Sequence, residues 1–213
     1  MATLFEYRDY LITGLITTVG VTLAGIALMT ILMIVFGMAL LSRHRPIRRA
    51  SRVYVEFFRG TSLLVQLFWW YYALPFFGIS LPALLVGVVG LGLNSGAYGA
   101  EVVRVSIKSV PIEQVEAGKA LNLSPTLIMR LIVLPQAFRI MLPPYANLCV
   151  ELLKGTSVVA LITIAELTFS ARYIAVRTFQ TEPAFIAILI CYFVLATLIV
   201  VPIRRLERRL RLV

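Results

Sequence analysis

Three long stretches without a charged residue constrain the fold most strongly. Residues 10–42 are uncharged over 33 positions, residues 60–100 over 41 and residues 183–203 over 21. A membrane-spanning helix needs about 20 apolar residues, and the first stretch is too long for a signal-peptide core of about 7–15 residues. The chain is 60% hydrophobic and 14% charged, whereas soluble domains are about 45–50% apolar and about 25% charged. We therefore expect an integral membrane protein.

The longest uncharged stretch contains two spans, because Pro75, Gly78 and Pro82 cluster near its middle. Residues 140–165 are also long enough to span, although they contain Glu151 and Lys154. The sequence thus predicts an all-α integral membrane protein with a single transmembrane domain over residues 1–213. Its five transmembrane helices are expected at about 11–41, 55–74, 82–103, 140–165 and 183–203.

Basic residues predict the orientation of the spans. Five arginines follow the first span in residues 43–52, the loop after the second span has none, and residues 204–211 contain five more. The positive-inside rule then places the N-terminus outside and the C-terminus in the cytoplasm. The segment 108–139 becomes cytoplasmic, and residues 166–182 become the last outer loop. The net charge of +10 fits membrane lipid as the partner of the basic tail, and we expect no nucleic-acid partner.

The cytoplasmic segment 108–139 is more than a connector. Pro111 is placed to begin a short helix, and Asn122 is suited to the left-handed conformation that ends one. Ser124 and Pro125 then provide a cap and a first-turn proline for a second helix, which we expect to end at Pro135. The sequence predicts two short helices joined by a tight turn.

The spacing within this segment matches a known pattern. Glu116-Ala-Gly118 is followed after three residues by Asn122, and after nine more by Ile132-Val-Leu-Pro135. This resembles the EAA loop of bacterial ABC importer permeases, whose pattern is Glu-Ala-Ala, three residues, Gly, nine residues, Ile-x-Leu-Pro. Gly118 replaces the third alanine and Asn122 replaces the glycine.

Three further segments, in the order of the family, resemble the polar amino acid permease subfamily. Residues 58–68 look like its Arg-Gly-Thr-Pro-Leu-Leu-Val-Gln segment, with Ser62 in place of proline. Residues 93–98, followed by Glu101 and Arg104, resemble its third-span motif. Residues 152–157 resemble Leu-Leu-Lys-Asp-Thr-Ser, with Gly155 in place of Asp. The resemblance implies the type I ABC importer transmembrane fold in a bacterial inner membrane.

The resemblance also implies partners. Such permeases work as a pair, with a second copy or a related chain, on two ATP-binding cassette subunits that bind ATP and Mg²⁺. A solute-binding protein outside the cell delivers a small polar, amino-acid-like substrate. This chain has no Gly-x-x-x-x-Gly-Lys-Ser/Thr phosphate loop, so we expect no ATPase site and no cofactor of its own. One histidine and two separated cysteines favour no metal site.

By the resemblance, the EAA segment is a coupling helix that docks on the ATPase. The residues assigned to this contact are Glu116, Ala117, Gly118, Leu121, Asn122 and Leu123. The simpler interpretation of Glu116 is a solvated charge on a helix.

The candidate substrate pathway combines charged and polar positions within the spans. A zwitterionic solute needs an acceptor for its ammonium and donors for its carboxylate, and charges within a span usually face a cavity. The simpler interpretations are a mutually paired Glu151 and Lys154 and interhelical hydrogen bonding by the polar residues. The candidates are Glu151, Lys154, Asn94, Ser95, Tyr98, Thr61, Gln66, Thr156 and Ser157.

The leading hypothesis is the permease subunit of an ATP-driven importer, and the alternative is an ion-gradient-driven secondary transporter of a small polar solute. The alternative predicts an inverted repeat or carboxylates for ion coupling. The sequence shows no repeat, and only Glu151 is clearly deep in a span. The solute stays open among polar amino acids and zwitterions such as ectoine.

Overall fold

The computed structural model describes residues 7–211, and within this range the regular structure is entirely helical. The all-α prediction is confirmed for these residues. The α-helices are α2 (Arg8–Leu40), α3 (Arg45–Gly60), α4 (Leu63–Phe68), α5 (Ala83–Lys108), α6 (Ile112–Ala120), α7 (Pro125–Ile128), α8 (Leu134–Val159), α9 (Leu167–Thr178) and α10 (Thr181–Arg211). Short π or 3-10 turns extend some of them, at Trp69–Ala73, Leu74–Phe77, Met129–Val133 and Ala160–Ile162.

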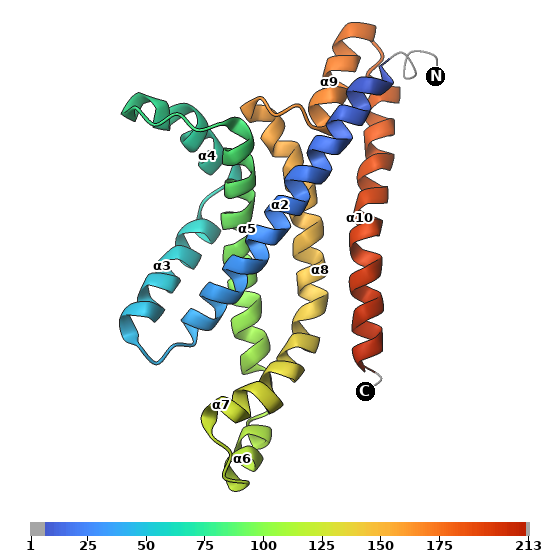
Figure 1. The fold of residues 1–213 in the computed structure, drawn as a ribbon. Coiled ribbons are helices and arrows are strands. Elements are labelled where there is room, and N and C mark those ends of the chain that lie inside the picture. The colour runs from blue at the N-terminus through green and yellow to red at the C-terminus, as the bar shows by residue number, and fades with distance from the viewer. Residues whose placement is uncertain (1–6, 212–213) are drawn as a thin grey trace.

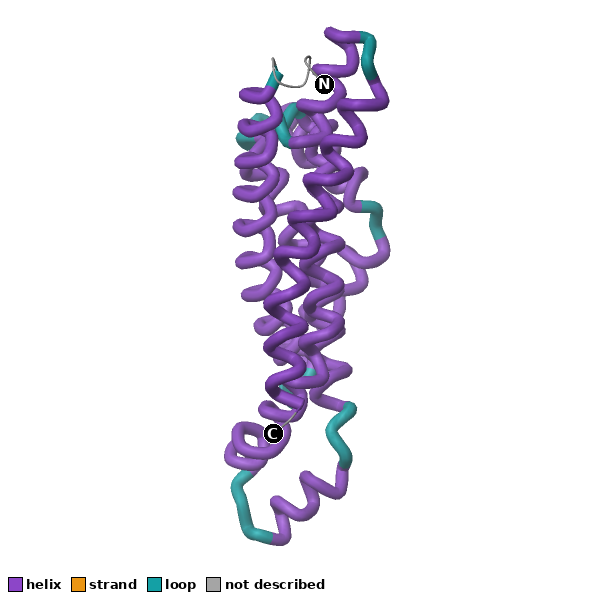
Figure 2. Tube along the Cα trace, turned by 90° about the vertical axis from the view of Figure 1, so that its right-hand side faces the viewer, coloured by secondary structure: helices purple, strands orange, loops and turns teal. Residues whose placement is uncertain are grey.

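Four long helices form an elongated bundle (Figure 1, Figure 2). Helices α6 and α7 lie at one end, α9 lies at the other, and α4 projects sideways. Four helices are long and apolar enough to cross a membrane: Arg8–Leu40, Ala83–Lys108, Pro125–Ile162 and Thr181–Leu210. The chain is therefore a multi-pass membrane protein.

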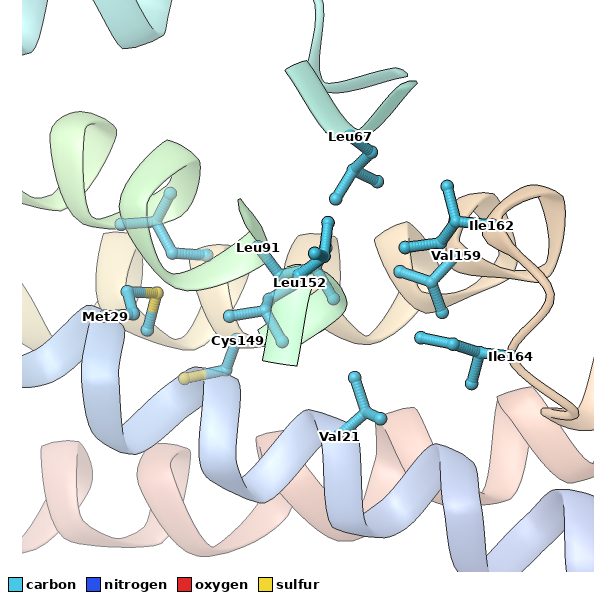
Figure 3. Packing of buried hydrophobic residues seen from close by; sticks show 11 residues of the cluster. Val21, Met29, Leu67, Leu91, Cys149, Leu152, Val159, Ile162 and Ile164 are labelled. Atoms are coloured by element: carbon cyan, nitrogen blue, oxygen red, sulfur yellow. The ribbon is translucent and has the colours of Figure 1, made fainter. Parts of the chain in front are cut away.

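Buried apolar side chains from α2, α4, α5, α8 and the turn after α8 meet in the largest core cluster (Figure 3). Leu67 anchors the projecting segment in this cluster, opposite Leu91 and Leu152. The labelled members are Val21, Met29, Leu67, Leu91, Cys149, Leu152, Val159, Ile162 and Ile164.

Glycines bring α2 and α5 into direct contact along their length. A Cβ at Gly92 would lie 2.6 Å from Leu28 Cδ2, and one at Gly96 would lie 2.9 Å from Leu32 Cβ. Real Cβ atoms do not approach so closely, so only glycine fits without a shift. Small residues spaced four apart commonly allow such contacts between membrane helices.

The prediction of one helix over residues 55–74 was wrong, because the helix is interrupted. Helix α3 ends at Gly60, and Thr61 and Ser62 are extended before α4 begins. The break is stabilised by hydrogen bonds from side chains to groups of the residues beside it. Gln66 Nε2 donates to the Thr61 hydroxyl at 2.6 Å, and Asn94 Nδ2 donates to the Phe58 carbonyl at 2.9 Å.

Residues 166–182, predicted as an outer loop, contain the packed helix α9. Glu166 is fully buried and caps this helix by accepting the Phe169 N–H at 2.8 Å. Its other oxygen accepts the Tyr192 hydroxyl of α10 at 2.8 Å. Leu167 and Ile174 belong to an apolar stripe of α9 that is buried against Ala184 and Ile188 of α10. The sequence did not reveal this stripe, because charged residues stand among the apolar residues of the segment.

Pro135 does not end the helix that begins at Pro125. The chain continues as helix to Ile162 through the π turn Met129–Val133. Pro135 lies in the first turn of the α-helix that resumes after the π turn, where proline is tolerated. The Gln136 side chain also donates to the Ile132 carbonyl at 2.9 Å.

Replacing Gly37 with alanine should destabilise the fold. A Cβ there would lie 2.6 Å from Val103 Cβ and 2.9 Å from the Ala100 carbonyl oxygen. Overpacking of this kind costs about 1–3 kcal/mol, so Gly37→Ala should lower the melting temperature of the detergent-solubilised protein. Gly20→Ala, in the same helix, meets no atom within 4 Å and should not lower it. Equal melting temperatures for the two variants would contradict the close contact.

Candidate functional site

A polar cavity of about 430 Å³ opens beside the α3–α4 break, halfway along α5 and α8. We call it the central cavity. It collects six residues of the predicted pathway, which are Thr61, Asn94, Ser95, Tyr98, Glu151 and Lys154. The remaining lining residues are Ser62, Leu63, Leu91, Leu148, Leu152 and Gly155.

Glu151 and Lys154 reach the central cavity from one face of α8. The salt bridges within residues 7–211 are Arg8–Asp9 and Glu101–Arg104, so the two side chains are not paired with each other. Both are exposed. A carboxylate and an ammonium that are not paired with each other therefore line one open cavity beside α5 and α8.

Gln66 and Asn94 support the wall of the cavity through hydrogen bonds, and of the two only Asn94 lines it. Gln66 is 5% exposed and is not part of the lining. Asn94 lines the cavity, but its Nδ2 also donates to the Phe58 carbonyl and, at 3.4 Å, to Gln66 Oε1. The role of Gln66 is therefore interhelical hydrogen bonding. Asn94 shares this role and also lines the cavity.

Tyr98 closes the α6 side of the central cavity together with Arg59. The Arg59 guanidinium carbon lies 5.3 Å from the centre of the Tyr98 ring, a cation–π distance. The Tyr98 hydroxyl also donates to the Arg59 carbonyl at 3.4 Å. The sequence did not indicate Arg59 as a neighbour of the pathway, because its contact with Tyr98 depends on the helix break after Gly60.

Thr156 and Ser157 lie away from the central cavity. The Thr156 hydroxyl is fully buried against the Leu153 carbonyl, at 2.7 Å, and the Tyr192 hydroxyl of α10, at 3.2 Å. Ser157 Oγ donates to the Lys154 carbonyl and borders a groove between α8 and α10. The structure places neither residue in the central cavity, although Ser157 shares the groove between α8 and α10 with Lys154.

Helix α6 presents an exposed surface at the far end of the bundle (Figure 1). Asn122 has φ 56°, the left-handed conformation predicted for it, and the Asn122 N–H donates to the Lys119 carbonyl at 2.9 Å. Of the six coupling candidates, four are exposed: Glu116, Ala117, Leu121 and Asn122.

Gly118 and Leu123 pack inward instead. A Cβ at Gly118 would lie 2.9 Å from Ile132 Cδ1 and 3.0 Å from Ile128 Cγ1. Leu123 joins the buried cluster that contains Ile128. These residues hold α6 against the start of the helix that leads to α8, and leave its outer surface to the others.

Among residues 7–211, no group of three or more His, Cys, Asp or Glu side chains is placed to hold a metal ion. The side chains that line the central cavity offer charge pairing and hydrogen bonding. Such an arrangement suits reversible binding of a small polar solute.

Helices that cross the membrane and a solute-sized polar cavity between them define a membrane transport subunit. The chain belongs to the family described as binding-protein-dependent transport system inner membrane component, whose model matches residues 33–212. It is a permease subunit of an ABC importer, and the resemblance drawn from the EAA spacing is confirmed.

Similar proteins cover nearly the whole chain. The sequence is 37% identical over 211 residues to the probable amino-acid ABC transporter permease protein y4tF of Sinorhizobium fredii, covering 95% of this chain and 89% of the relative. It is 38% identical over 201 residues to the L-cystine transport system permease protein TcyB of Bacillus subtilis, covering 92% and 86%. A solved structure described as an amino acid ABC transporter with histidines matches with a TM-score of 0.91 and 33% identity, covering 98% and 97% of the two chains.

Replacing Gln66 with leucine should destabilise the break between α3 and α4. The change removes the hydrogen bonds of the Gln66 amide to the Thr61 hydroxyl, to the Phe58 and Thr61 carbonyls and to the Asn94 amide. The expected loss is about 1–3 kcal/mol, measured as a lower melting temperature in detergent. Thr197→Val, which removes an exposed hydroxyl bonded within its own helix, should have little effect. A Gln66→Leu protein as stable as the wild type would show that the amide network does not hold the break.

Proposed function

We propose that this permease subunit forms the translocation pathway for a polar amino acid or a related zwitterion, delivered by a solute-binding protein outside the cell. The observation that carries the proposal is the unpaired Glu151 and Lys154 facing one central cavity. The names of the similar proteins, which are amino-acid and L-cystine permeases, support the same class of solute.

The lining fits the two charges of a zwitterion. Glu151 accepts hydrogen bonds from the ammonium group of the solute, and Lys154 donates to its carboxylate. Thr61, Ser95 and Tyr98 add hydroxyl groups that bind and orient the polar end of a side chain. A cavity of about 430 Å³ lies within the range of about 300–1,000 Å³ typical of small-molecule sites.

For the membrane topology we propose five crossings, of which α3, α4 and the turns to Phe77 together make the second. The N-terminus then lies outside and the C-terminus lies in the cytoplasm of a bacterial inner membrane. The arginines of residues 43–52 and 204–211 support this orientation. Helix α6 falls on the cytoplasmic side, where ATPase subunits are found.

ATP-binding cassette subunits supply the energy, and this chain contributes no ATPase site to the complex. Two such subunits, which bind ATP and Mg²⁺, contact the exposed surface of Glu116, Ala117, Leu121 and Asn122 in the assembly we propose. A second permease subunit completes the pathway. The absence of a phosphate loop from the sequence is consistent with this division of labour.

Movement at α6 reaches the central cavity through one helical unit. Helix α6 packs on Ile128 and Ile132, and the helix from Pro125 continues to Ile162. Glu151 and Lys154 lie on that same helix. In this mechanism, closure of the ATPase subunits pushes α6, and the continuous helix carries the displacement to the substrate site.

ATP-driven transport accounts for the structure better than an ion gradient does. An ion-coupled carrier needs carboxylates that bind and release ions within the membrane. The deeply buried Glu166 is occupied as a helix cap and as the acceptor of the Tyr192 hydroxyl. Family membership and the exposed α6 surface favour the ATP-driven class.

Reversing the charge of Glu116 should uncouple ATP hydrolysis from uptake. Glu116→Lys places a cation on the exposed face of α6 without touching the cavity. In the complex reconstituted with its ATPase and binding protein, uptake should fall at least about tenfold, which corresponds to about 1.4 kcal/mol of lost coupling. The matched variant Glu182→Lys, at an exposed site on α10, should transport normally. Normal uptake by well-expressed Glu116→Lys would contradict the docking role.

Neutralising Glu151 should weaken solute binding. Glu151→Gln keeps the shape but loses a charged acceptor, and hydrogen bonds to charged groups are worth about 1.5–3 kcal/mol. The KM for uptake of a zwitterion should rise at least about tenfold, while ATPase activity without solute stays near the wild-type level. Glu182→Gln serves as the control for charge. An unchanged KM and rate would remove Glu151 from the pathway.

A further inference from the structure

A second cavity, of about 620 Å³, lies at the α6 end of the bundle between α2, α3 and α5. We call it the basic cavity. Its cationic lining residues are Arg48, Arg52 and Arg59 from α3 and Arg104 and Lys108 from α5. Glu56 and Glu101 are its carboxylates, so cations exceed anions by three.

Most of the cations retain hydrogen-bonding capacity. Arg104 is paired with Glu101 through two of its nitrogens, and Arg48 donates to the Ser42 carbonyl at 2.9 Å. Within residues 7–211, Arg52 and Lys108 make no hydrogen bond or salt bridge. Like charges gathered in one cavity repel each other, and an anion placed among them would relieve that repulsion.

Apolar side chains also contribute to the basic cavity and its neighbourhood. Leu40, Leu41 and Val55 form part of its wall. On the outside of α3, Val53 and Phe57 are 67% and 56% exposed. Helix α3 therefore combines arginines with exposed apolar side chains, the composition of a helix at a membrane interface.

The position along the bundle matches a lipid headgroup. Leu40 is the last residue of the apolar helix α2, and Lys108 is the last residue of α5. The cavity thus lies where two apolar spans end and charged residues begin. Basic pockets between membrane helices at this level bind anionic lipid headgroups.

We infer that the basic cavity binds the phosphate group of an anionic membrane lipid such as phosphatidylglycerol, with Arg52 and Lys108 as its main contacts. The acyl chains lie against the apolar surface of α3. A soluble phosphate shares the chemistry of the headgroup, but it would leave that surface uncovered. The bound lipid neutralises excess charge beside the α3–α4 break and is independent of the transported solute.

The experiment is native mass spectrometry of the assembled complex released from bilayers of phosphatidylethanolamine and phosphatidylglycerol. The test variant is Arg52→Gln with Lys108→Gln. Each interfacial cation is worth about fivefold in binding to anionic lipid, so retained phosphatidylglycerol should weaken about 25-fold. Retained phosphatidylethanolamine should not change.

The control is Arg45→Gln with Arg49→Gln, which removes the same number of positive charges from exposed positions of α3 outside the cavity lining. It should retain phosphatidylglycerol as the wild type does. Equal loss in both double variants would reduce the effect to general surface charge and overturn the proposal. A wild-type complex that retains phosphatidylglycerol no better than phosphatidylethanolamine would also overturn the proposal. This result is expected if a second permease copy covers the cavity.

Competition distinguishes the two sources of phosphate. Inorganic phosphate and glycerol phosphate, added at constant ionic strength before release, should leave the retained lipid in place. Displacement of the lipid by either small anion would overturn the lipid proposal in favour of a soluble ligand. Retention against both, lost only in Arg52→Gln with Lys108→Gln, would establish the site.

Discussion

The break between α3 and α4 determines the arrangement of both cavities. Gln66 and Asn94 donate hydrogen bonds to the Phe58 and Thr61 carbonyls, which an unbroken helix would have paired with its own N–H groups. Within a membrane, backbone groups at a helix break need such partners or a cavity that holds water. Because the break is held, Thr61 points into the central cavity while Arg59, two residues earlier, lines the basic cavity.

A single continuous helix joins the ends of the molecule that a transport cycle must connect. The helical segment Pro125–Ile162 has 38 residues, a length of about 57 Å at 1.5 Å per residue. Its first turn contacts α6, and Glu151 and Lys154 lie within it. The π turn at Met129–Val133 allows Pro135 within this helix without breaking it. Continuity gives a displacement at α6 a direct route to the cavity.

The sequence predicts those features that depend on single segments. Missing charges located α2, α5 and α10, and residue spacing located α6 and the left-handed Asn122. The errors at Thr61, Glu166 and Pro135 share a different cause. Each depends on a partner distant in the chain or on a local change of helix type, such as the bond from Tyr192 to Glu166. Pattern and propensity carry no information about such partners, and the contact of the Thr156 hydroxyl with Tyr192 of α10 is a further example.

Two carboxylates of this chain, those of Glu166 and Glu151, have different surroundings. Glu166 is fully buried, and both of its oxygens accept hydrogen bonds from fixed donors. Glu151 is exposed to the central cavity without such a donor, three residues from a lysine with which it does not pair. A charge in a span costs about 2.5–3.5 kcal/mol on insertion scales, and Glu151 recovers none of this from the protein. In the function proposed above, water stabilises this carboxylate until a solute replaces the water.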